Sequence, residues 1–236
     1  MVLSRTVAIA AVLLLGVTGS VAAGEVSGTV RLTSPVPAAE SIKIEEGTKA
    51  ARAVEECGRL PRVSPKLIVS PDGGVQNAVI WLEGSFERPY DGATDGAVIL
   101  DQQACTFSPH VLVAPQGSTL RVRNSDDVVH NVRLFRESAL LWRKWQQPRA
   151  TELTWRLDAP GRYVMRCGVH PWMYAWVIVA EHEYYTVSDA SGRFTLARVS
   201  PGNHRLHAWH ETLGERIEEL RVGDDQAVVT VSFEQD

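Results

Sequence analysis

Short segments rich in β-branched and aromatic residues limit the folds open to this chain more than any other feature. Turn residues separate these segments, as at Pro71–Gly74, Asn124–Asp127 and Ser200–Gly202. Thr119–Arg123 alternates apolar and polar residues, as a strand with one buried face does. Many short strands without long helices are typical of β-sandwiches, so we predict an all-β protein. The segments predicted as strands are Val26–Leu32, Lys66–Val69, Ala78–Leu82, Ala97–Leu100, Thr119–Arg123, Asn131–Phe135, Tyr163–Cys167, Ala175–Val179, Phe194–Leu196 and Val228–Phe233.

Helical periodicity is weak and confined to two stretches. Thr48–Glu56 and Glu137–Trp145 each have a pattern that a short helix would satisfy. We therefore predict two short helices at these places in an otherwise all-β chain.

The N-terminus has the layout of a secretory signal peptide. A basic start at Arg5 precedes the apolar run Thr6–Val17, and small residues precede a cleavage point after Ala23. We expect the signal peptide, residues 1–23, to be removed and the mature protein to be exported, for example to a periplasm; a retained N-terminal anchor is the alternative. No other apolar run approaches the length of a stable membrane span. The formal net charge is −4 and no basic run occurs, so nucleic acid is not an expected partner.

The chain has three cysteines, and an odd number in an exported protein leaves one thiol without a partner. Cys167 is the expected free thiol, because a histidine and a methionine follow it closely. Cys57 and Cys105 are then expected to form a disulfide, although sequence alone leaves the other pairings open.

The stretch CGVHPWM, residues 167–173, places a thiol, an imidazole and a thioether on one short loop. A blue-copper site has one Cys thiolate and two His nitrogens near one plane, with a weak axial Met. Such a site needs the Cys at the end of a strand and the second His from a neighbouring strand. Tyr163–Cys167 is a predicted strand, and His130 begins another. The sequence therefore predicts one copper ion with the ligands His130, Cys167, His170 and Met173.

These motifs resemble those of the cupredoxins, most closely the amicyanin branch, whose ligand loop has the same Cys-x2-His-Pro-x-Met form. The sequence His-Asn-Val at residues 130–132 and the lead-in Phe107–Asn124 are similar to plastocyanin-like chains. The resemblance covers about residues 105–180 and implies a Greek-key β-sandwich with one type 1 copper held by the same four ligands. It also implies that Asn131 braces the Cys loop and that the ring edge of His170 lies nearest to solvent as the electron port.

The resemblance implies a carrier of single electrons, with a cytochrome or a dehydrogenase as its redox partner. Trp172, if it is exposed beside His170, would contribute to an apolar docking patch. We expect no enzymatic activity, because no catalytic motif occurs and Asp126–Asp127 is typical of a turn. Two other classes of function stay open: a copper storage or delivery protein, and a β-sandwich binding module with a vestigial metal site.

Other metal centres fit the sequence less well. Multicopper oxidases flank the ligand Cys with His, whereas Arg166 and Gly168 flank Cys167 here, and a binuclear centre needs a second thiolate on this loop. A zinc site made of Cys105, His110, Cys167 and His170 is an alternative, but it would leave Met173 and His130 without a role. His110 is expected to have a structural or surface role.

His204, His207 and His210 lie close together in the sequence, a spacing that could suggest a metal site. In a strand, however, His207 lies on the face opposite to His204 and His210. Only a helix or a bulge would gather all three, so we do not expect a site there.

The C-terminal part carries a second resemblance. Asp189–Phe194 reads Asp-x-x-Gly-x-Phe and a Pro-Gly pair follows, as in carboxypeptidase regulatory-like (transthyretin-like) β-sandwiches, which usually open like Gly28–Pro35. Residues 185–233 are too few to bury a good core alone, so we predict that this sandwich is split around the cupredoxin-like part. The alternative is one extended cupredoxin with appended strands. The predicted division is residues 24–48 for the first strands, 57–182 for the cupredoxin-like domain and 183–236 for the remaining sandwich.

Overall fold

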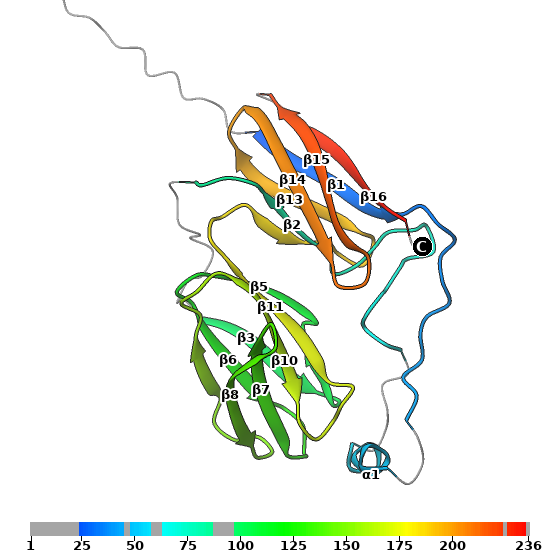
Figure 1. Ribbon diagram of the computed structural model, residues 1–236, viewed down its shortest axis with the longest axis vertical. Helices are drawn as coiled ribbons and strands as arrows, with labels where there is room; N and C mark the ends of the chain where they lie inside the picture. The colour runs from blue at the N-terminus through cyan, green and yellow to red at the C-terminus, as the bar shows by residue number, and fades with distance from the viewer. Residues whose placement is uncertain (1–23, 45–47, 58–62, 87–96, 224–225, 235–236) are drawn as a thin grey trace, which may run out of the picture.

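The computed structural model of the protein describes residues 24–44, 48–57, 63–86, 97–223 and 226–234 (Figure 1). The predicted signal peptide, residues 1–23, lies outside the described residues. The described chain contains sixteen strands and one helix, so the predicted all-β fold class is confirmed. The strands form four sheets, which pack in pairs into two β-sandwiches. Within these described ranges, no helix has the length and apolar character needed to cross a membrane.

The central sandwich consists of residues 97–180. Apolar side chains from its two sheets, such as Leu120 from one and Leu134 from the other, fill the space between them. The first sheet has the order β4 (Thr106–Ser108), β3 (Ala97–Gln103), β6 (Thr119–Asn124) and β9 (Leu153–Arg156). The second sheet has the order β5 (Val111–Pro115), β11 (Tyr174–Ala180), β10 (Gly161–Cys167), β7 (His130–Arg136) and β8 (Ala139–Gln146).

The terminal sandwich combines strands from both ends of the chain. Its core includes Val30 and Phe233 from one sheet and Ile80 and Leu206 from the other. The first sheet has the order β13 (Arg193–Val199), β1 (Gly24–Leu32) and β16 (Ala227–Phe233). The second sheet has the order β12 (Tyr185–Val187), β2 (Val79–Leu82), β14 (Gly202–His210) and β15 (Gly214–Val222).

β1 links the two ends of the chain within one sheet. It pairs antiparallel with β13 and parallel with β16, from Val26 opposite Ala227 to Leu32 opposite Phe233. Both neighbours of β1 follow the central sandwich in sequence. The chain therefore leaves the terminal sandwich after β2, builds the central sandwich and returns at β12, as Figure 1 shows.

The structure differs from the predicted division at β2. The prediction assigns residues 57–182 to the cupredoxin-like domain, but β2 pairs with β12 and β14 of the terminal sandwich. The sequence of β2, VIWL, is apolar throughout because Ile80 faces the core of its own sandwich and Trp81 packs against the central one. A continuous apolar run indicates burial on both faces but does not say which sandwich provides the cover.

One of the two predicted helices forms. The helix α1 (Lys49–Glu56) begins after Thr48, whose hydroxyl accepts a hydrogen bond from the Ala51 backbone N–H at 3.2 Å. The other prediction is wrong, because Glu137 lies in the turn between β7 and β8, and Ala139–Gln146 is a strand. Cross-strand pairing with β7 overrides the weak helical pattern there.

The two sandwiches meet along β5 and β11 of one and β2, β12 and β14 of the other. Val111 and Ile178 are buried there, and the rings of Trp176 and Trp209 lie 4.9 Å apart in an edge-to-face contact. The contact covers the β5–β11 side of the five-stranded sheet and leaves the β7–β8 side uncovered by the terminal sandwich.

Gly28 tests the position of β1 at the centre of its sheet. A Cβ at residue 28 would overlap the ring of Phe194 and the carbonyl oxygen of Val229 on the two neighbouring strands. We expect Gly28→Val to lower the free energy of unfolding by about 1–3 kcal/mol through overpacking, measured by urea denaturation. Thr29→Val, on the other face of β1, is the control and should change stability by less than about 0.5 kcal/mol. Equal losses in both variants would contradict the packing of Gly28 between β13 and β16.

Candidate metal centre

Strand pairing brings two of the predicted ligands to one end of the five-stranded sheet. β7 begins at His130 and β10 ends at Cys167, and the two strands are antiparallel neighbours with Cys167 opposite Val132. Because the start of one strand then lies beside the end of the other, His130 and Cys167 are close although they are 37 positions apart in the sequence.

The loop after β10 brings the third ligand back to the same place. The Cys167 backbone N–H donates to the Met173 carbonyl at 3.0 Å, and the Met173 N–H donates to the His170 carbonyl at 3.0 Å. The Gly168 N–H donates to the Asn131 carbonyl on β7 at 2.8 Å. These three hydrogen bonds fold residues 168–173 inward over the end of the sheet.

The three donor atoms form a compact triangle. The Nδ1 atoms of His130 and His170 are 3.0 Å apart, and the Cys167 Sγ lies 3.7 Å from the first and 3.5 Å from the second. A point equidistant from the three atoms is about 2.0 Å from each, close to the usual lengths of metal–imidazole and metal–thiolate bonds. The triangle therefore fits one metal ion with two imidazoles and one thiolate.

Burial keeps both imidazoles in the form that binds metals. The side chains of His130 and His170 are fully buried, and Cys167 is 6% exposed. Burial lowers the pKa of His130, and burial together with the nearby His130 lowers the pKa of His170 to about 4. Both rings are thus neutral near pH 7, with a lone pair available on Nδ1.

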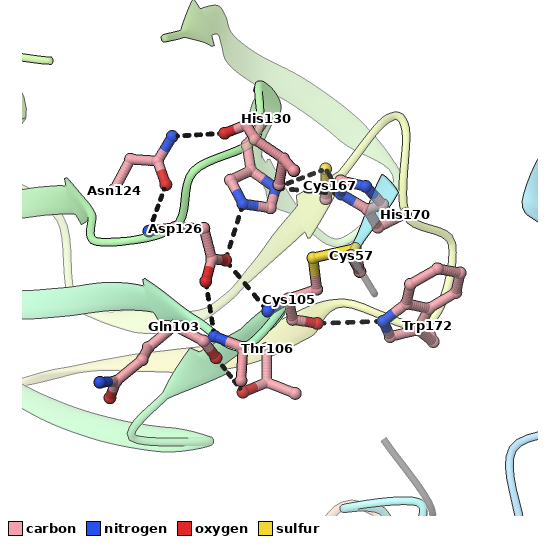
Figure 2. The surroundings of a disulfide bond; sticks show 12 residues. Cys57, Gln103, Cys105, Thr106, Asn124, Asp126, His130, Cys167, His170 and Trp172 are labelled. Atoms are coloured by element: carbon pink, nitrogen blue, oxygen red, sulfur yellow. Dashed lines mark hydrogen bonds and ion pairs between the residues drawn. A yellow bond between two sulfur atoms is a disulfide. The ribbon is translucent and has the colours of Figure 1, made fainter. Parts of the chain in front are cut away.

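Asp126 fixes the tautomer of His130. The His130 Nε2 donates to the Asp126 carboxylate at 3.0 Å, which leaves the lone pair on Nδ1 facing Cys167 and His170. The carboxylate also accepts from the backbone N–H groups of Ala104 and Cys105, at 2.6 and 3.0 Å (Figure 2). Sequence reasoning took Asp126 for a turn residue and missed this role. The sequence signal that could have indicated this role is the position of an acidic residue four places before a predicted ligand histidine.

The turn before β7 holds Asp126 in place. The Asn124 side-chain oxygen accepts from the Asp126 N–H at 3.1 Å, and its amide nitrogen donates to the Val128 carbonyl at 2.9 Å. The side chain of Asn124 is 2% exposed. A buried amide thus fixes the turn that carries the carboxylate to His130.

Met173 is buried at the end of the ligand loop. Its side chain is 2% exposed and belongs to the core of the central sandwich. The backbone hydrogen bonds of Met173 help to close the loop. Its role as axial ligand stays a prediction.

Asn131 braces the Cys loop in a way that the sequence did not predict. The bond to the loop comes from its backbone carbonyl, which accepts from the Gly168 N–H. The side-chain oxygen of Asn131 accepts instead from Arg133 Nε at 2.7 Å. Any backbone carbonyl could brace Gly168 in this way, so the side chain serves to position Arg133.

The prediction that the ring edge of His170 lies nearest to solvent is wrong. His170 is fully buried, and its Nε2 has no hydrogen-bond partner among the described residues. The Trp172 ring lies 5.4 Å from the His170 ring and is itself only 8% exposed, so Trp172 forms no exposed patch. The Trp172 indole N–H donates to the Cys105 carbonyl at 3.0 Å.

A disulfide-linked segment adds to this cover. The predicted disulfide between Cys57 and Cys105 is confirmed, and Cys167 is the free cysteine among the described residues. The sulfur atoms of the disulfide lie within 4.8 Å of an imidazole nitrogen of His170. Figure 2 shows the disulfide beside His170, and Ala53 of α1, four residues before Cys57, is buried against the central core. We call residues 48–57 the cap.

The other candidate ligands are occupied elsewhere. Cys105 is in the disulfide and so cannot serve in the alternative zinc set. His110 pairs with Glu211 at the contact between the sandwiches. In β14, His204 is half-buried and bonds the Ser200 carbonyl, His207 bonds Glu83 and Glu215, and His210 is buried. Among the described residues, these three histidines form no common site.

In comparisons with known proteins, no family model and no curated protein matches the chain. Solved structures do match part of it. A purple cupredoxin from Nitrosopumilus maritimus is 22% identical with a TM-score of 0.32, over 35% of this chain and 99% of that chain. A variant of amicyanin in its Cu(I) form is 23% identical with a TM-score of 0.34, over 44% and 99%.

A copper-containing nitrite reductase from Thermus scotoductus SA-01 is 22% identical with a TM-score of 0.31, over 36% of this chain and 22% of that chain. Each of these likenesses covers less than half of this chain. The resemblance of the terminal sandwich to carboxypeptidase regulatory-like domains stays a prediction.

Replacing Asp126 tests the support of His130. Asp126→Asn removes the charged acceptor and should weaken copper binding by about 10- to 100-fold, as loss of a partner to a metal-bound histidine typically does. The affinity is measured by competition with a chelator of known strength. Asp127→Asn is the matched control, because Asp127 is 80% exposed and pairs only with Arg149 among the described residues. Equal affinities of the two variants would contradict the role of Asp126.

Proposed function

We propose that the protein is a type 1 copper protein that carries single electrons. The observation that supports this most is the buried triangle of His130, His170 and Cys167 donor atoms. Two neutral imidazoles and one thiolate suit copper in both oxidation states, and the buried thioether of Met173 follows on the same loop. Copper bound there would supply a one-electron couple.

The chain's own contribution is a fixed set of ligands. Asp126 orients His130, hydrogen bonds close the loop around Cys167, and His170 is fully buried beside the disulfide and Trp172. A site whose ligands are held by paired strands and a hydrogen-bonded loop changes little in geometry between two oxidation states. That property favours fast transfer of single electrons.

Burial favours the carrier over copper storage or delivery. A delivery protein has to release its ion to an acceptor, which needs an exposed ligand that the acceptor can approach. All three triangle residues are buried here. The proposal includes export, directed by the signal peptide predicted at residues 1–23.

The absorption spectrum of the copper-loaded mature protein tests this proposal. We expect an intense visible band from thiolate-to-copper charge transfer, which disappears on reduction with ascorbate. Cys167→Ala should remove the band entirely, because it deletes the thiolate. His204→Gln is the control and should keep the band, since His204 lies on β14 of the terminal sandwich and bonds only the Ser200 carbonyl among the described residues.

Two results would overturn the proposal. One is a colourless wild-type protein in the presence of one equivalent of copper. The other is transfer of Cu(I) to a chelator within seconds, which would identify a delivery protein. A carrier should hold the ion for hours under the same conditions.

A further inference from the structure

Three arginines stand in a row on the outer face of the five-stranded sheet. Arg166 on β10 lies directly opposite Arg133 on β7, and Arg133 lies directly opposite Arg143 on β8. All three side chains are on the face away from the core, because their neighbours along each strand, such as Val132 and Met165, point into the core.

None of these three arginines forms an ion pair with a carboxylate among the described residues. Other arginines of the central sandwich do, as Arg123 with Glu152 and Arg156 with Asp158. At the β11 end of the row, Tyr174 bonds Glu211, but that carboxylate already pairs with His110. Like charges directly opposite each other destabilise a sheet, so the row is favourable only when an anion compensates it.

Exposed apolar side chains accompany the arginines on β8. Trp145 is 64% exposed and lies opposite Asn131, next to Arg143 on the same face. A bulge at the start of β8 turns Leu140 and Leu141 to this face as well, and they are 47% and 40% exposed. We call Arg133, Arg143, Arg166 and Trp145 the arginine face.

The arginine face adjoins the metal centre. The guanidinium of Arg133 lies against Gly168, where a Cβ would overlap it. Gly168 is exposed and directly follows Cys167, whereas His170 on the other side of the centre is buried beneath the cap. The chain next to the thiolate therefore reaches the surface at the arginine face.

We propose that the arginine face is the docking surface for a redox protein whose own surface is acidic. Charge complementarity carries this inference: three arginines without carboxylate partners occur on a chain whose net charge is −4. Arginine and tryptophan are also enriched at protein interfaces. The row crosses three strands over about 10 Å of open sheet, which suits an array of carboxylates better than a small anion in a pocket. The redox character of the partner rests on the proposed function.

The test compares two probes that differ mainly in charge. They are native cytochrome c, whose surface is basic, and cytochrome c with succinylated lysines, whose surface is acidic. Binding to the metal-free protein is measured by titration calorimetry at low ionic strength, so the result does not depend on copper. We expect binding of the succinylated form only, and loss of this binding as salt screens the charges.

Charge reversal on the face identifies the surface. Arg143→Glu/Arg166→Glu should weaken binding of succinylated cytochrome c at least about tenfold. Arg216→Glu/Arg221→Glu on β15 has the same change in net charge and should stay within about twofold. Trp145→Ser, which changes no charge, should weaken binding about fivefold, because Trp145 belongs to the same docking surface. Equal losses in the two double variants would overturn the proposal, as would a short DNA duplex that binds as tightly as the succinylated cytochrome.

A kinetic measurement separates this inference from the proposed function. The reduced, copper-loaded protein would pass one electron to the ferric haem, and the rate should follow the same order among the variants. Equal rates in wild type and Arg143→Glu/Arg166→Glu would contradict the docking surface but not the proposed function as an electron carrier. The opposite outcome is a copper-loaded protein that reduces neither cytochrome, while the metal-free protein still binds the succinylated form. That result would contradict the proposed electron-carrier function but not the docking surface.

Discussion

The pairing of β7 with β10 is the interaction on which the metal centre depends. Its register sets Cys167 opposite Val132, so that the start of one strand and the end of the other supply two donor atoms at the same edge. The same register places Arg133 opposite Arg166 on the outer face. Because side chains alternate along a strand, one pairing determines both the ligands inside the sandwich and the arginine face outside it.

Cys105 contacts both the residue that orients His130 and the residues that pack over the metal centre. Its backbone N–H bonds Asp126, which orients His130, and its carbonyl accepts from Trp172 of the ligand loop (Figure 2). Its sulfur binds Cys57 and thereby holds the cap over His170. A site covered in this way has to reach its partners elsewhere on the surface, and Gly168 beside Arg133 offers the exposed position next to Cys167.

The terminal sandwich limits which surface stays available. It covers the outer face of the sheet along β5 and β11, where Trp176 meets Trp209 and Glu211 bonds His110 and Tyr174. The β7–β8 part of the same face lies beyond this contact (Figure 1). Insertion of the central sandwich between β2 and β12 anchors it at both ends, which favours a fixed relation between the two cores.

The sequence by itself determined the all-β class, most of the strands and the set of candidate ligands, because alternation, turn residues and donor types are local properties. It favoured the Cys57–Cys105 disulfide, and the structure decided that pairing. Only the tertiary structure decided which sandwich β2 joins, that Glu137–Trp145 enters a hairpin, and that Asp126 orients His130. It also decided that His170 is buried, which the motif CGVHPWM could not indicate. Burial depends on residues that pack from distant parts of the chain, here Cys57 and Cys105, and a local pattern contains no record of that packing.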